Sequence, residues 1–153
     1  MERVNEKYGW VVFLFLGILW LVVGLYQAFT PDVLMEEDVQ HILGMSWSEL
    51  QVLSPEAALY ARWLMGALGM LKISWSLFVL AITLTGFRKG ERWAWYTLWL
   101  APALLVGQGI YNSVFFGDIN EMLQWIPILS INLFGLFLPY RKFFPRNPQS
   151  RDV

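Results

Sequence analysis

One lysine stands alone in a long apolar stretch of this chain. Lys72 is the only charged residue between Trp63 and Phe87, a block of 25 residues. Such an ammonium could act as a Schiff-base nucleophile, bind a polar ligand, or donate structural hydrogen bonds. A Schiff base needs an apolar pocket and a carbonyl cofactor, and neither is indicated. The sequence therefore predicts no catalytic residue and leans against an enzyme.

Other polar side chains fall at a matching depth along the apolar blocks. Lys72, Gln108 and Gln124 each lie 16 or 17 residues from a basic residue that flanks their block, which is about 24 Å at 1.5 Å per helical residue. Steps of three and four residues place further polar groups on the same helical faces. The predicted polar layer consists of Lys72, Ser76, Gln108, Asn112, Glu121, Gln124 and Asn132. Glu121 is the expected counter-ion of Lys72.

This layer has two interpretations. Lys72 lies about 6 Å below the expected outer boundary of the membrane, so its side chain can reach the headgroups, and glutamine or asparagine side chains can join helices by hydrogen bonds. Alternatively, the layer lines a cavity for a polar ligand or an ion. The sequence favours the structural interpretation, and the cavity is kept as the alternative interpretation.

Four apolar blocks must position these residues. Hydrophobic residues make up 57% of the 153-residue chain, above the roughly 45–50% of soluble domains. About 20 helical residues cross a bilayer, and each backbone polar group must be satisfied inside its own segment. We therefore expect an all-α integral membrane protein, a bundle of four transmembrane helices at about 8–29, 55–87, 91–116 and 119–140. Pro102 and Pro127 should bend the last two helices.

Basic and acidic ends alternate along the chain. The N-terminus, the 88–92 turn and the tail carry the lysines and arginines that flank the blocks, whereas the segments 30–57 and 116–121 carry acidic residues. The positive-inside rule then places both termini in the cytoplasm and the protein in the inner membrane. We expect one domain, 1–144, followed by a disordered tail, 145–153. A net charge of −1 does not suggest nucleic acid as a partner.

The segment 30–54 is predicted to form a short helical cap on the outer side. Thr30 and Pro31 have the pattern of a helix start, Gly44 that of a helix end, and Ser46 to Glu49 that of a capping box. The expected apolar undersides comprise Val33, Leu34, Ile42, Leu43, Trp47, Leu50 and Leu53. The cap either seals the bundle or acts as a lid over a cavity, and amphipathicity alone favours sealing.

The composition argues against several kinds of site. The chain has no cysteine and a single histidine, His41, so thiolate metal sites, iron–sulfur clusters and bis-histidine haem ligation are excluded. No metal and no cofactor is expected.

Three stretches resemble a known group of proteins. "GMSWSEL", "SPEAALYARWLMGALGML" and "GFRKGERWAWYTLWLAP" are similar to recurring features of small uncharacterised four-helix membrane proteins of prokaryotes, distantly DoxX-like. The resemblance covers most of the chain and rests on packing and topology signals. DoxX is associated with a quinone-linked oxidoreductase, but no redox residue matches here, so that activity is not carried over.

The expected role follows from these observations. We predict a non-enzymatic bundle in the lipid bilayer that binds lipid, a small apolar molecule, or a partner membrane protein such as a second copy in a homodimer. The alternative is a membrane-embedded enzyme or small carrier that uses the polar layer around Lys72.

Overall fold

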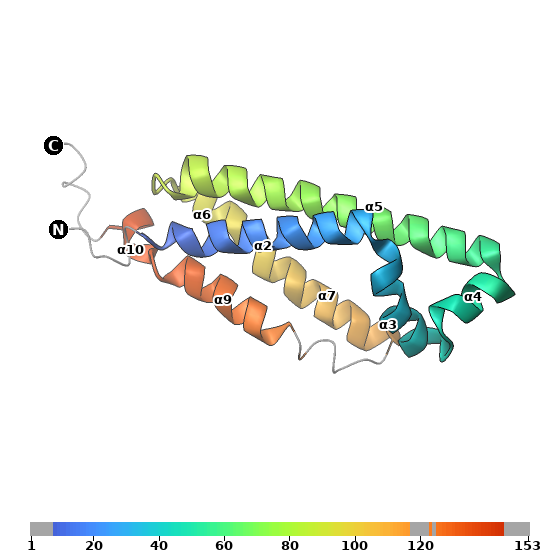
Figure 1. Cartoon of the computed structure of the whole chain (residues 1–153). Helices are drawn as coiled ribbons and strands as arrows, with labels where there is room; N and C mark the ends of the chain where they lie inside the picture. The colour runs from blue at the N-terminus through green and yellow to red at the C-terminus, as the bar shows by residue number, and fades with distance from the viewer. Residues whose placement is uncertain (1–7, 117–122, 124, 146–153) are drawn as a thin grey trace. The chain divides into compact units, whose positions relative to one another are not determined.

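A computed structural model describes residues 8–116, 123 and 125–145, and all secondary structure in these residues is helical (Figure 1). The helices are α2 (Trp10–Phe29), α3 (Pro31–Leu43), α4 (Trp47–Leu53), α5 (Pro55–Ile82), the π-helical turn η1 (Thr83–Phe87), α6 (Arg92–Leu98), α7 (Leu100–Phe116), α9 (Ile126–Phe137) and α10 (Tyr140–Phe143).

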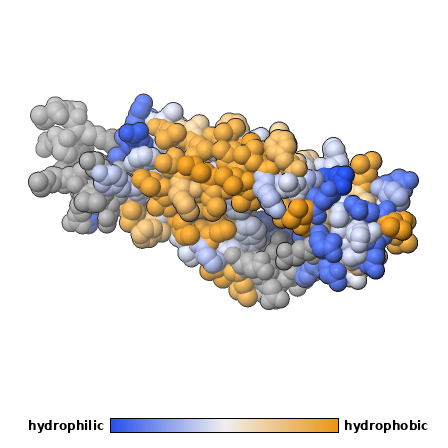
Figure 2. Space-filling view, in the orientation of Figure 1, coloured by the Kyte–Doolittle hydropathy of each residue, from blue (hydrophilic) through white to orange (hydrophobic). Residues whose placement is uncertain are grey.

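Three helical stretches are long and apolar enough to cross a membrane: Trp10–Phe29, Pro55–Phe87 and Arg92–Phe115. Ile126–Phe137 is apolar but shorter. Large hydrophobic side chains are exposed along these helices, and Figure 2 shows one face on which they gather. The fold is thus that of an all-helical protein compatible with a membrane.

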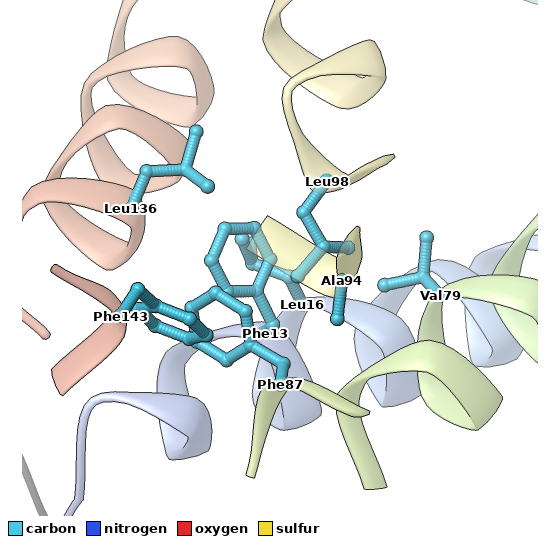
Figure 3. Packing of buried hydrophobic residues seen from close by; sticks show 8 residues of the cluster. All are labelled: Phe13, Leu16, Val79, Phe87, Ala94, Leu98, Leu136 and Phe143. Carbon is cyan, nitrogen blue, oxygen red and sulfur yellow. The ribbon is translucent and has the colours of Figure 1, made fainter. Parts of the chain in front are cut away.

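The chain divides into two compact units. The central unit is Gly17–Phe78, and the terminal unit combines Met1–Leu16 with Val79–Val153. The core of the terminal unit is built around three aromatic rings in contact (Figure 3). Phe87 makes an edge contact with Phe13, at 5.2 Å between ring centroids, and a tilted contact with Phe143, at 4.8 Å. Leu16, Val79, Ala94, Leu98 and Leu136 complete this core.

The core of the central unit is smaller and lies where α3 and α4 pack on the start of α5. It consists of Met35, Val39, Trp47, Leu50 and Ala58. The predicted capping box is present in α4, since Ser46 Oγ accepts from the Glu49 amide and the Glu49 carboxylate accepts from the Ser46 amide. Gly44 ends α3 in the left-handed conformation, as the sequence predicts.

The apolar undersides of α3 and α4 differ from the predicted set. Trp47 and Leu50 are buried, but Val33, Ile42, Leu43 and Leu53 are exposed. Met35 and Val39 pack inward instead, because residues four apart share one face of a helix. Thr30 is the N-cap residue of α3 and Pro31 its first residue, as the sequence predicts. The Thr30 hydroxyl, however, donates to the Tyr26 carbonyl of the preceding helix and does not cap α3.

Pro102 is the third residue of α7 and Pro127 the second residue of α9, so each lies close to a helix start. Pro127 occupies the first turn of α9, where a missing N–H costs no hydrogen bond. The stretch around Pro102 is interrupted at Trp99, between α6 and α7. The last turn of the long helix is a π turn, in which the Arg88 amide donates to the Thr83 carbonyl.

Candidate functional site

The ammonium of Lys72 is bonded to a glutamine on α2. Lys72 Nζ donates to Gln27 Oε1 at 2.5 Å, and Gln27 Nε2 donates to Met65 Sδ at 2.7 Å. Gln27 is only 3% exposed, so its amide would be costly to bury without these partners. We call these three residues the Lys72–Gln27 cluster.

An aromatic ring adds to this environment. Lys72 Nζ lies 5.8 Å from the ring centroid of Trp20, within the range of a cation–π contact. Trp20 and Gln27 are seven residues apart on α2, two turns along the same face. The ammonium therefore has both a neutral acceptor and a ring face on one helix.

Two glycines explain how these side chains meet. A Cβ on Gly69 would lie 2.5 Å from the Ala28 amide nitrogen, and a Cβ on Gly24 would lie 2.9 Å from the Ile73 amide nitrogen. The backbones of α2 and α5 therefore touch within the central unit, as small residues permit in membrane helices. Gln27 follows Gly24 by three residues and Lys72 follows Gly69 by three. Gln27 is the neighbour of Ala28 and Lys72 the neighbour of Ile73, so both polar residues lie between the two backbone contacts.

Ser76 is buried one turn beyond Lys72 on the same helix. Its hydroxyl donates to the Lys72 carbonyl at 2.7 Å, a common bond for serine inside a helix. The bond satisfies Ser76 within α5. Ser76 therefore contributes a backbone-directed hydroxyl to the region.

The remaining predicted residues belong to the terminal unit. Gln108 Nε2 donates to Asn112 Oδ1 at 3.1 Å, one turn along α7. Asn132 Nδ2 donates to the Ile128 carbonyl at 2.8 Å within α9. Each of these bonds lies inside a single helix. Glu121 and Gln124 lie outside the described residues. The predicted pairing of Lys72 with the third and fourth helices stays a prediction.

Gln27 is the residue that the predicted polar layer lacks. It ends the first apolar block at the depth of Lys72, but it stands in no stripe of polar residues. The signal that could have identified it is the shared spacing of glycine and polar residue, Gly24 to Gln27 and Gly69 to Lys72.

A second polar contact ties α3 to α5. Arg62 donates through Nε and Nη2 to the two carboxylate oxygens of Asp32, at 2.8 and 2.6 Å. Near this bidentate pair, an open groove is lined by Trp47, Gln51, Pro55, Ala58, Leu59 and Arg62. The groove does not include Lys72.

The capping box also changes the acidity of one of its own side chains, which lies outside the apolar helices. Hydrogen bonds from the backbone and the hydroxyl of Ser46 hold the pKa of Glu49 below its usual value. The bonds stabilise the charged carboxylate, so the shift follows from the cap geometry.

Gln27 and Met65 can offer Lys72 only hydrogen-bonding contacts. Neither an amide nor a thioether exchanges protons near neutral pH. Within the described part of the chain, no group of three or more His, Cys, Asp or Glu side chains is placed to hold a metal ion.

Comparison with known proteins adds no relative. No family model matches the chain, and neither a curated protein nor a solved structure is significantly similar to it.

Proposed function

We propose that this chain is a four-span inner-membrane protein that acts without catalysis, by binding lipid, a small apolar molecule or a partner membrane protein. The observation that carries the proposal is the Lys72–Gln27 cluster, where the lone ammonium is already bonded to an amide on a neighbouring helix. A lysine used in this way stabilises helix packing, and what remains for other molecules is the apolar surface of the helices.

The exposed hydrophobic residues support the binding role. Large apolar side chains on α2, α5 and α7, such as Phe15, Phe78 and Val114, are each more than 60% exposed in the isolated chain. Exposed apolar area on this scale marks a surface that lipid or another protein covers. The acyl chains of a bilayer, a small apolar ligand and a second copy of this chain all match that chemistry.

The four-span topology rests on the charges between the apolar stretches. Three stretches are long enough to span, and Ile126–Phe137 supplies an apolar part of the fourth. The proposal places both termini in the cytoplasm and α3 and α4 outside as a cap. Reporter fusions at the C-terminus and near Glu37 should then report opposite sides, whereas one side for both would contradict four spans.

A cap that seals the fold should also shield its buried tryptophan. The ring of Trp47 lies in the core formed by α3, α4 and α5. Its fluorescence, assigned by difference with Trp47→Phe, should resist aqueous quenchers. Full quenching would mean that α3 and α4 are loosely attached.

The alternative is a membrane-embedded enzyme or carrier, and one observation favours it. Among the residues that the structure describes, the buried polar side chains of the apolar helices are Gln27, Ser76, Thr83, Asn112 and Asn132. Such groups often mark a path or site for polar ligands. The distant resemblance to DoxX-like proteins stays a prediction.

Mass spectrometry of co-purifying molecules separates the two functions. Protein extracted in a gentle detergent should carry lipid or an apolar molecule in wild type and in Lys72→Met alike if the binding role is right. A polar metabolite present in wild type and lost in Lys72→Met would favour the enzyme or carrier.

A further inference from the structure

The terminal unit gathers positive charge on two short segments. The hairpin 88–92 and the stretch 139–145 together carry five cations: Arg88, Lys89, Arg92, Arg141 and Lys142. The single carboxylate in these segments, Glu91, accepts a hydrogen bond from Trp93 Nε1 at 2.6 Å. The two segments therefore have a net of four positive charges.

Hydrogen bonds to the backbone hold the two segments together. Lys142 Nζ donates to the Arg88 carbonyl at 2.8 Å, and Arg92 Nε donates to the Phe143 carbonyl at 3.2 Å. Gly90 turns the hairpin with a φ of 81°, and a Cβ there would lie 3.1 Å from Lys142 Cγ. Adjacent residues of α10 thus contact both ends of the hairpin, which fixes the positions of the cations.

Aromatic rings orient the two guanidinium groups. Arg88 lies over the ring of Trp10, at 5.0 Å from Cζ to the centroid, and Arg92 lies over the ring of Phe144, at 5.4 Å. Stacking occupies the face of a guanidinium and leaves its N–H edges for acceptors in the plane. In Arg92 the Phe143 carbonyl takes the Nε–H, so the edge between the two Nη groups is the one that can bind a further acceptor. A phosphate binds such an edge through two parallel hydrogen bonds.

The surrounding residues indicate where that phosphate comes from. Trp93, Tyr96 and Tyr140 are exposed beside the hairpin and α10, and tryptophan and tyrosine concentrate at the headgroup level of membranes. A cationic site inside such a belt meets phospholipid headgroups.

We propose that Arg88 and Arg92 form a binding site for the phosphate of an anionic phospholipid. Trp10 and Phe144 orient the guanidinium groups, and Lys142 joins the hairpin to α10. The site lies in the terminal unit, separate from the Lys72–Gln27 cluster. It rests on the proposed function only in requiring that the chain lies in a bilayer.

The test compares neighbouring cations. The full chain is reconstituted in phosphatidylcholine bilayers with increasing fractions of phosphatidylglycerol whose acyl chains carry bromine. Bromine quenches tryptophan on contact, so the quenching curve gives the affinity for phosphatidylglycerol relative to phosphatidylcholine, with brominated phosphatidylcholine as reference. Arg88→Gln removes a guanidinium but keeps the Arg88 carbonyl that binds Lys142, and Lys89→Gln removes the same charge one residue away.

The expected result is a selective loss. Wild type should prefer phosphatidylglycerol, and Arg88→Gln should lower that preference about fivefold, the effect of one well-placed surface cation. Lys89→Gln should lower it less than about twofold. Arg88→Lys keeps the charge but not the planar N–H edge, so its loss should fall between the two.

Three outcomes would overturn the proposal. Equal losses in Arg88→Gln and Lys89→Gln would show that only the summed charge attracts lipid. Absence of any preference in wild type would show that no such site exists. A lost preference in Lys72→Met would place lipid recognition elsewhere, whereas an unchanged preference there supports the site whatever the fate of the proposed function. Melting curves in pure phosphatidylcholine confirm that each variant is folded.

Discussion

The two units of this chain differ in the interactions that stabilise each of them internally. In the terminal unit, residues from α2, α5, η1, α6, α9 and α10 meet in one core, in which Phe13, Phe87 and Phe143 are almost completely buried. In the central unit, the tertiary contacts include the Lys72–Gln27 cluster, the Arg62–Asp32 ion pair and the close approach of two glycines.

The difference shows how composition decides the source of stability. Core packing depends on the volume of the buried side chains, so truncating a large buried side chain lowers the free energy of unfolding strongly. Contact between two helix backbones requires residues with small side chains at the crossing point. Polar pairs in membrane helices contribute about 1 kcal/mol or less to stability. We therefore expect large-to-small changes to affect the terminal unit most, and small-to-large changes the central unit.

The largest effect is expected for Phe87→Ala. Its ring touches both Phe13 and Phe143, so truncation should lower the free energy of unfolding by about 3–5 kcal/mol, measured by denaturant titration in detergent micelles. Phe78→Ala, at a residue that is 65% exposed, is the control and should cost under about 1 kcal/mol. Similar losses for both would mean that ring packing does not distinguish the terminal unit.

The second-largest effect is expected for a small-to-large substitution in the central unit. Gly69→Ala places a Cβ against the Ala28 backbone and should cost about 1–3 kcal/mol in the same titration. Gly66→Ala is matched in helix and chemistry, but its Cβ would lie 3.8 Å from the Ala28 carbonyl oxygen. That variant should be neutral or gain up to about 1 kcal/mol in helix propensity. A tolerated Gly69→Ala would contradict the backbone contact.

A smaller effect concerns the polar pair. In a double-mutant cycle of Lys72→Met and Gln27→Leu, the combined loss of stability should fall short of the sum by about 1 kcal/mol. The same cycle with Glu121→Gln in place of Gln27→Leu measures the partner predicted from spacing. If Lys72→Met were additive with Gln27→Leu but coupled to Glu121→Gln, then Glu121 and not Gln27 would be the partner of Lys72.

The smallest effect is a pH dependence at α4. The pKa of Glu49 is lowered in the folded chain, so its cap stabilises α4 fully above the unfolded-state pKa of about 4.3 and loses this as the pH falls through the folded value. The protection of α4 amides from hydrogen exchange, taken relative to the intrinsic exchange rate at each pH, should therefore decrease on acidification in wild type. Glu49→Gln keeps a capping side chain without the titration, and its opening free energy should not change with pH.

The sequence predicted the local features of this fold better than its contacts. Uncharged blocks identified the apolar helices, and capping chemistry located Gly44 and Ser46, because these signals reside in neighbouring residues. Pro127 was placed inside a helix since the uncharged block continues across it. The partner of Lys72 was missed because helical phase gives the face of a residue, not the helix that the face meets. Gln27 meets Lys72 because Gly24 and Gly69 let the backbones of α2 and α5 touch, and a contact between two particular helices is not a local property of the sequence.

The π turn at Thr83–Phe87 constrains the number of residues that can lie between Thr83 and Arg92. Each residue advances an α-helix by about 100°, so removing one residue before Arg88 would turn the hairpin away from Trp10 and α10. Surface hairpins ordinarily accept insertions and deletions. Here a change of length would separate the cations from their rings even if every side chain were kept. We therefore expect selection to act on the number of residues between Thr83 and Arg92 as strongly as on their identity.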